Sequence, residues 1–122
     1  MSKKITLVED DKDAATMLTK MLSNAGYTVN SLNEGTSLVE KDTTIPDMFI
    51  LDNFMPTIHG VALCKYLKLQ ERTKAVPVII ISANQQLKNK ATEAGATLFL
   101  GKPFHSSDLL RVVEEVFSAN GK

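Results

Sequence analysis

Five short apolar runs recur along the sequence, and most of the segments between them are long enough to hold a helix. The runs cover residues 5–8, 27–29, 48–51, 78–81 and 97–100. Strands that alternate with helices connect by right-handed crossovers, which gives a parallel sheet with helices on both faces. The sequence therefore predicts an α/β fold, a doubly wound three-layer α/β/α sandwich around a five-stranded parallel sheet.

The expected helices differ in how clearly the sequence marks them. An apolar stripe over residues 14–25 predicts the first helix, and Gly26 follows as a typical C-terminal stop. Between residues 33 and 42 the apolar pattern is weak, so the second helix should be short or irregular. The remaining helices should begin near Gly60, cover residues 87–94 before Gly95, and run from about 106 to 119.

Size and charge restrict the class of protein. At 122 residues and 43% apolar composition, residues 1–122 are expected to form a single domain. Fourteen basic and fourteen acidic side chains cancel, which argues against nucleic acid binding or attachment to an anionic membrane by this domain. A single cysteine, Cys64, and the lack of a signal peptide or a membrane-spanning apolar stretch lead us to expect a cytoplasmic location.

Charged side chains stand at the ends of three of the apolar runs. Glu9 and Asp10 follow the first run, Asp52 follows the third and Lys102 follows the last. Ligand sites of open parallel sheets lie at the carboxyl ends of the strands, so these groups should converge if the strands are neighbours. Three crowded carboxylates repel one another, and a hard divalent cation such as Mg²⁺ would compensate their charge.

Such a pocket suits an incoming phosphoryl group. Its oxygens would bind the cation and the Lys102 ammonium while a carboxylate attacks phosphorus, and Asp52 is the best candidate for that nucleophile. Ser82 follows the very apolar run 78–81, where its hydroxyl is placed to hydrogen-bond a phosphoryl oxygen. The residues alone thus indicate phosphoryl chemistry.

Several motifs together make the chain resemble the receiver domain of two-component response regulators, from about Lys4 to Phe117. The motifs are Val8-Glu9-Asp10-Asp11, residues 46–52, Met55-Pro56 with Gly60, Ser82-Ala83 and Lys102-Pro103-Phe104. The resemblance implies the chemotaxis-regulator-like form of the doubly wound fold, a flavodoxin-like (βα)5 arrangement. It also implies a phosphoprotein of signal transduction rather than an enzyme, with only autocatalytic phosphorylation and slow self-dephosphorylation.

The resemblance assigns chemical roles to particular positions. Asp52 would accept a phosphoryl group from a histidine kinase or a histidine phosphotransfer protein and become an aspartyl phosphate. Glu9, Asp10, Asp52 and the backbone carbonyl of Phe54 would hold Mg²⁺, and Lys102 would pair with the phosphoryl group. Because Glu9-Asp10-Asp11 offers two overlapping acidic pairs, a share of Asp11 in the metal site stays open, although capping of the first helix is its favoured role.

The resemblance also implies a conformational switch. Ser82 would be the hydroxyl that moves toward the phosphoryl group, Phe99 the aromatic side chain that swings inward, and the peptide bond before Pro103 would be cis. The surface formed by the fourth helix, fifth strand and fifth helix would then bind a downstream protein. Free-standing action, a role as a phosphorelay intermediate, and a place within a longer transcription regulator or hybrid kinase all stay open.

Rival functions on the same scaffold fit the sequence less well. A nucleotide or flavin site favours a glycine-rich turn after the first strand, whereas this chain has acids there. Aspartyl phosphatases of the haloacid dehalogenase kind place a second Asp two residues after the nucleophile, and this chain has Phe54. A degenerate receiver that binds partners without phosphorylation is disfavoured because each chemical position is filled.

Overall fold

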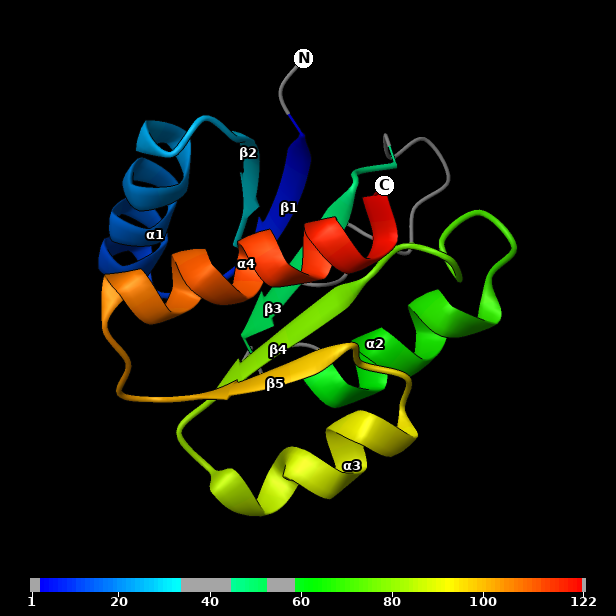
Figure 1. Ribbon diagram of the computed structural model, residues 1–122. Coiled ribbons are helices and arrows are strands. Elements are labelled where there is room, and N and C mark those ends of the chain that lie inside the picture. Colours follow the sequence, from blue (N-terminus) through cyan, green and yellow to red (C-terminus); the bar gives the residue numbers. More distant parts are fainter. Residues whose placement is uncertain (1–2, 34–44, 53–58, 122) are drawn as a thin grey trace.

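A single parallel sheet of five strands forms the middle layer of the molecule (Figure 1). The computed structural model describes residues 3–33, 45–52 and 59–121. The strand order is β2-β1-β3-β4-β5, so the first and third strands of the chain are neighbours near the centre. The strands are β1 (Lys4–Val8), β2 (Thr28–Leu32), β3 (Met48–Asp52), β4 (Val78–Ser82) and β5 (Leu98–Gly101).

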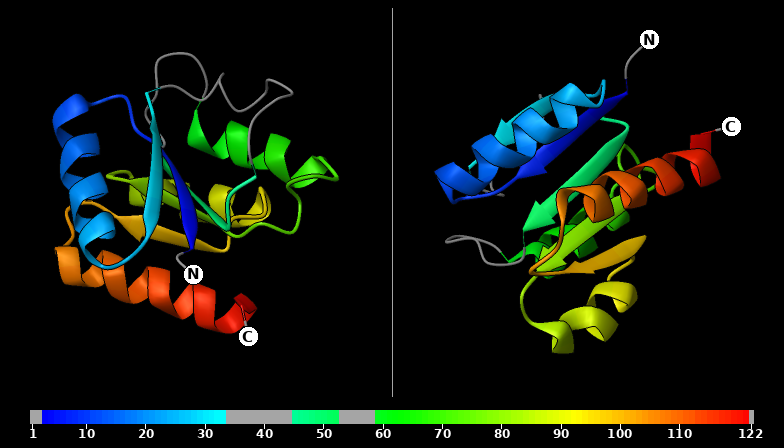
Figure 2. Two further views of the ribbon diagram at one scale, coloured as in Figure 1. Left: turned by 90° about the horizontal axis from the view of Figure 1, so that it is seen from above. Right: turned by 60° about the vertical axis from the view of Figure 1, so that its left-hand side comes forward.

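Helices cover both faces of the sheet (Figures 1 and 2). One face packs against α1 (Lys12–Asn24) and α4 (Ser106–Gly121), and the other against α2 (Gly60–Leu69) and α3 (Lys88–Glu93). A short 3₁₀ turn, η2 (Gln85–Leu87), precedes α3. The predicted three-layer, doubly wound fold is confirmed. The second helix was expected between residues 33 and 42, and all of this segment after residue 33 lies outside the described residues.

Strict alternation along the central strands builds the two cores. In β3, Met48 and Ile50 point to the α1/α4 side, and Phe49 and Leu51 to the α2/α3 side. All four are at most 1% exposed, as expected for a parallel strand with helices on both faces. At the edge of the sheet, β2 runs over residues 28–32 instead of the predicted 27–29, because its polar outer residues hide the strand from an apolar pattern.

Local signals in the sequence set the ends of α1. Asp11 is its N-cap, and the Asp11 carboxylate accepts a hydrogen bond of 3.0 Å from the backbone N–H of Asp13. Gly26 follows the helix with φ at +103°, a conformation that suits glycine because it has no β-carbon. Asp11 therefore takes the capping role that the sequence favoured for it.

Among the described residues, the structure holds no helix of the length and apolar character required to cross a membrane.

Candidate functional site

Three acidic side chains meet where β1 and β3 end. The two strands pair in parallel with Val8 opposite Leu51, so Glu9 and Asp10, just past β1, lie beside Asp52 at the end of β3. One carboxylate oxygen from each acid lies within 4.8 Å of the other two. The structure thus brings together the three acids that were singled out from the sequence.

The three acids differ in their exposure to solvent. Glu9 is 3% exposed and Asp52 is 4% exposed, whereas Asp10 is exposed. The cluster therefore consists of two buried carboxylates and a third that is open to solvent. Asp11 does not belong to it, since its side chain points to the start of α1.

The donor set fits a small, hard divalent cation. Mg²⁺ prefers oxygen ligands and takes few of them from the protein, so carboxylates within reach of one point are suitable partners. Burial strengthens the fit, because Glu9 and Asp52 have little water to screen their mutual repulsion. The expected fourth ligand, the backbone carbonyl of Phe54, lies outside the described residues.

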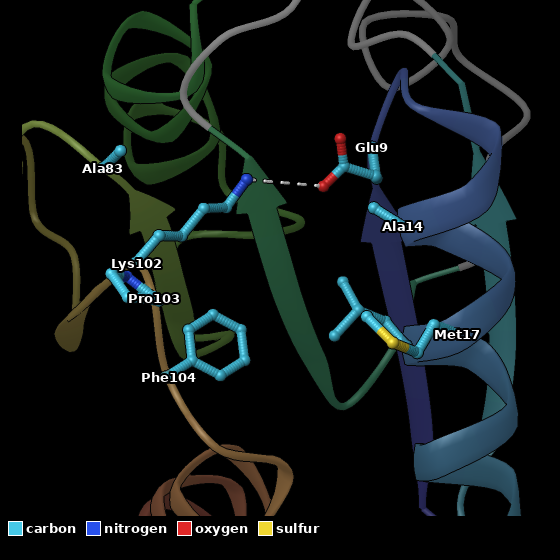
Figure 3. A pocket seen from close by; sticks show the side chains of 8 residues that line it. Glu9, Ala14, Met17, Ala83, Lys102, Pro103 and Phe104 are labelled. Carbon is cyan, nitrogen blue, oxygen red and sulfur yellow. Dashed lines mark ion pairs between the residues drawn. The ribbon is translucent and has the colours of Figure 1, made fainter.

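Lys102 supplies the positive charge of the site. It follows β5 directly, and its side chain reaches back across the end of β4 toward the acids (Figure 3). Its Nζ lies 3.3 Å from Asp52 Oδ1 and 3.9 Å from Glu9 Oε1. A flexible side chain with a compact ammonium can follow a new anion at this place, as an added phosphoryl group would require.

The proton affinity of Glu9 is strongly changed by its surroundings. Burial raises the pKa of this carboxyl from 4.5 to about 7, and its hydrogen bond with Asp52 and the charge of Asp52 act in the same direction. The backbone N–H of Asp11, which donates to Glu9 Oε2 at 3.2 Å, and the Lys102 ammonium lower it again only in part. Near neutral pH the Glu9 carboxyl of the metal-free site is therefore partly protonated, and a bound cation would displace that proton.

Ser82 ends β4, next to the acidic cluster in the sheet. Its side chain is fully buried, and its Oγ accepts a hydrogen bond of 3.0 Å from the backbone N–H of Asn84. Its carbonyl accepts a second bond, of 2.9 Å, from the backbone N–H of Lys102. The hydroxyl is therefore held in the turn that leaves β4, one strand away from Asp52.

Phe99 lies on the same side of the sheet as Ser82. In the β4–β5 register, Phe99 is opposite Ile80 and Gly101 is opposite Ser82. The Phe99 ring is partly buried against the α2/α3 core, and side chains two residues apart in a strand share a face. The hydroxyl and the ring expected to act together thus line one surface of the sheet.

The peptide bond between Lys102 and Pro103 is cis, the conformation expected from the resemblance.

An apolar groove beside the acids was not predicted from the sequence. It has a volume of about 450 Å³ and runs between α1 and the segment after β5, with Glu9 and Lys102 at one end (Figure 3). Its apolar walls are Ala14, Met17, Leu18, Ala83, Pro103 and Phe104. Met17 belongs to the apolar stripe that the sequence predicted for the first helix, but it is 61% exposed, whereas Leu18 and Leu22 of the same stripe are buried.

Comparisons with known proteins agree on one family. The model of the response regulator receiver domain matches residues 5–114. The transcriptional regulatory protein GltR of Pseudomonas aeruginosa is 32% identical over 112 residues, which cover 87% of this chain and 45% of that protein. The chain spans about half the length of the curated relatives it matches.

Solved structures give the same picture. A putative response regulator from Chloroflexus aurantiacus superposes with a TM-score of 0.90 at 30% identity, covering 97% of this chain and 99% of that one. The receiver domain of the sensor histidine kinase PA1611 from Pseudomonas aeruginosa, at 28% identity, has a TM-score of 0.85 and covers 94% of this chain and 97% of that one. That structure has a magnesium ion coordinated in its active site cleft.

Proposed function

Because this chain belongs to the receiver domains of two-component response regulators, we propose that Asp52 accepts a phosphoryl group in a Mg²⁺-dependent reaction and that the resulting aspartyl phosphate switches a protein-binding surface. Receiver domains are signalling modules rather than enzymes that turn over a substrate. The observation that carries the proposal is the convergence of Glu9, Asp10, Asp52 and Lys102 at the carboxyl ends of the strands.

The transfer step uses one carboxylate oxygen of Asp52. That oxygen forms a bond to phosphorus while the bond from phosphorus to the donor's imidazole nitrogen breaks, and the imidazole leaves with the electron pair of that bond. Lys102, 3.3 Å from Asp52, moves with the charge from the carboxylate to the phosphoryl oxygens. Glu9, Asp10, Asp52 and the Phe54 carbonyl would hold Mg²⁺, which neutralises negative charge on the acids and the phosphoryl group.

The switch follows from the position of Ser82. A phosphoryl group adds up to about two negative charges with strong acceptor oxygens, and the Ser82 hydroxyl is the nearby neutral donor. When that hydroxyl turns to the phosphoryl group, the hydrogen bond from Asn84 must lengthen or break. Phe99 then has room to move inward along the shared face, which alters the surface formed by α3, β5 and α4 for a downstream protein.

The phosphoryl donor is proposed to be a histidine kinase or a histidine phosphotransfer protein. The groove between α1 and Phe104 ends at Lys102, so an apolar side chain of the donor can pack there while its phosphohistidine reaches Asp52. The similarity to a transcriptional regulatory protein and to a receiver domain of a sensor kinase supports either a longer regulator or a hybrid kinase as the natural setting, and a phosphorelay intermediate is the alternative.

Intact mass spectrometry after incubation with acetyl phosphate and Mg²⁺ tests the proposal. The wild type should gain about 80 Da, the mass of one phosphoryl group, and Asp52→Asn should gain nothing. Asp47→Asn is the matched control, because Asp47 is an exposed acid just before the same strand. A gain of the same mass in Asp52→Asn, or no gain in the wild type with either acetyl phosphate or phosphoramidate, would contradict the proposal.

A further inference from the structure

The end of the Gln85 side chain lies directly against Gly101. A β-carbon built on Gly101 would come within 2.9 Å of the Gln85 Cδ and closer still to its Nε2. The Gln85 carboxamide thus occupies the place that a side chain at position 101 would take. Because glycine has no β-carbon, Gly101 leaves room for the Gln85 carboxamide. The contact between the two residues links the start of η2 to the end of β5.

The space above Gly101 is part of the surface on which the proposed switch acts. Gly101 is opposite Ser82 in the register, and Phe99 precedes Gly101 by two residues on the same face. A Phe99 ring that moves along this face toward Ser82 approaches Gly101. The Gln85 carboxamide already lies there, so both side chains cannot fill this space at once.

Gln85 is also connected to the Ser82 hydroxyl through the backbone. Asn84 donates its N–H to Ser82 Oγ at 3.0 Å, and its own side chain accepts from the backbone N–H of Gln86 at 3.0 Å. Asn84 is the cap of the 3₁₀ turn in which Gln85 is the first residue. A shift of Ser82 Oγ is therefore passed to Gln85 by one residue held at both ends.

We infer that Gln85 is a positioning residue of the switch, whose side chain occupies the space above Gly101 in the resting state and leaves it when Ser82 turns to a phosphoryl group. The inference rests on the proposed function. Gln85 as a whole is exposed, so its side chain can swing into solvent without crossing the core. Its departure gives Phe99 the space beside Ser82.

A double-mutant cycle tests the contact itself. Gly101→Ala should raise the unfolding equilibrium constant by a factor that is about five times larger in the wild-type background than in the Gln85→Ala background. The reason is that only the wild type has a carboxamide to displace. Equal effects of Gly101→Ala in the two backgrounds would show that the contact does not exist in solution and would overturn the inference.

Binding of beryllofluoride, a phosphoryl mimic, tests the role in the switch. Calorimetry suits this chain, which has no tryptophan to report binding by fluorescence. With Mg²⁺ present, Gln85→Ala should bind beryllofluoride about three to ten times more tightly than the wild type, while its affinity for Mg²⁺ alone stays within about twofold. Gln85→Met, which keeps the length of the side chain, should return the affinity to that of the wild type.

The neighbouring Gln86→Ala is the matched control, since the Gln86 contact with Asn84 uses only its backbone. An unchanged or weaker affinity in Gln85→Ala, or an equal gain in Gln86→Ala, would overturn the inference while leaving the proposed function intact. A wild type that binds Mg²⁺ but no beryllofluoride would instead refute the proposed function, and the inference with it.

Discussion

Glu9 and Asp52 are acids buried at the ends of neighbouring central strands, where an apolar residue would stabilise the fold more. Each is at most 4% exposed, and the Lys102 ammonium lies closer to Asp52 than to Glu9. Two buried negative charges with one shared ammonium repel each other and destabilise the folded state, unless a proton or a cation binds between them. At the residue scale, these two acids therefore lower the stability of the metal-free domain.

This cost predicts an unusual pH dependence of the metal-free domain. With a pKa of about 7 when folded and 4.5 otherwise, Glu9 holds its proton more tightly in the native state. Its contribution to stability is therefore complete below pH 4.5 and is lost as pH rises through 7, by at most about 3 kcal/mol. Urea unfolding at several pH values, with a chelator present, measures this loss. The unfolding free energy of the wild type should fall more steeply between about pH 5 and 8 than that of Glu9→Gln.

The matched control for this experiment is Glu93→Gln on the exposed side of α3. Its unfolding free energy should follow that of the wild type at every pH. If the unfolding free energy of Glu9→Gln also followed that of the wild type at every pH, the Glu9 carboxyl would not be desolvated in the native state.

At the scale of elements, α1 and the segment after β5 form the two walls of the apolar groove. Met17 on α1 is 61% exposed, although the sequence placed it on the apolar stripe of the first helix. Across the groove, Pro103 and Phe104 follow Lys102 directly. An apolar surface beside the proposed phosphorylation site is suited to contact a protein phosphodonor, whereas a small phosphodonor does not need it.

Met17→Gln should therefore separate the two kinds of donor. With a histidine phosphotransfer protein that phosphorylates the wild type, transfer should slow about five- to thirtyfold, which corresponds to the loss of an apolar anchor worth about 1–2 kcal/mol. Phosphorylation by acetyl phosphate should change less than about twofold. Rates can be measured by intact mass or by gels that separate the phosphorylated form.

Leu69→Gln is the control for Met17→Gln, because Leu69 is 73% exposed at the far end of α2. It should leave both rates unchanged. Equal slowing with protein donor and acetyl phosphate in Met17→Gln would mean that Met17 acts on the acids and not on the donor protein.

At the scale of the whole molecule, the strand order decides which chemistry is possible. Because β1 and β3 are adjacent while β2 lies at the edge, acids separated by about forty residues of chain meet at one point. β4 separates β3 from β5, and the long side chain of Lys102 reaches across it to Asp52. Folding therefore assembles the charges, and ligands that bind the assembled site must in turn stabilise the fold.

Asp52→Asn is expected to have opposite effects with and without metal. In the presence of a chelator at pH 8, it should be about 1 kcal/mol more stable than the wild type, because one of the two buried charges is gone. At a Mg²⁺ concentration about 100 times its Kd, the wild type should gain about 2.7 kcal/mol and the variant much less. Denaturant unfolding with and without Mg²⁺ gives both differences.

Glu93→Gln serves again as the control and should follow the wild type in both conditions. If Mg²⁺ stabilised Asp52→Asn as much as the wild type, the cation would be bound elsewhere on the domain.

Local sequence determined the elements and the chemical type of the site. Apolar runs separated by segments long enough for a helix predicted the parallel sheet, Asp11 and Gly26 predicted the ends of α1, and acids at strand ends indicated a cation and a phosphoryl group. These signals are local because capping, periodicity and strand burial depend on residues close in the chain. The edge strand β2 was predicted poorly for the same reason, since its neighbours in space determine its length.

Tertiary structure alone decided how deeply each acid is buried and which side chains meet outside the predicted cluster. Contacts between distant segments leave Asp10 exposed while they bury Glu9 and Asp52. Such contacts also place Met17 and Phe104 in one groove and the Gln85 side chain against Gly101. The pKa of Glu9 belongs with them, because it comes from desolvation and from an acid on another strand. The sequence specified which groups were available, and their distances and burial came only from the packing of strands and helices that carry them.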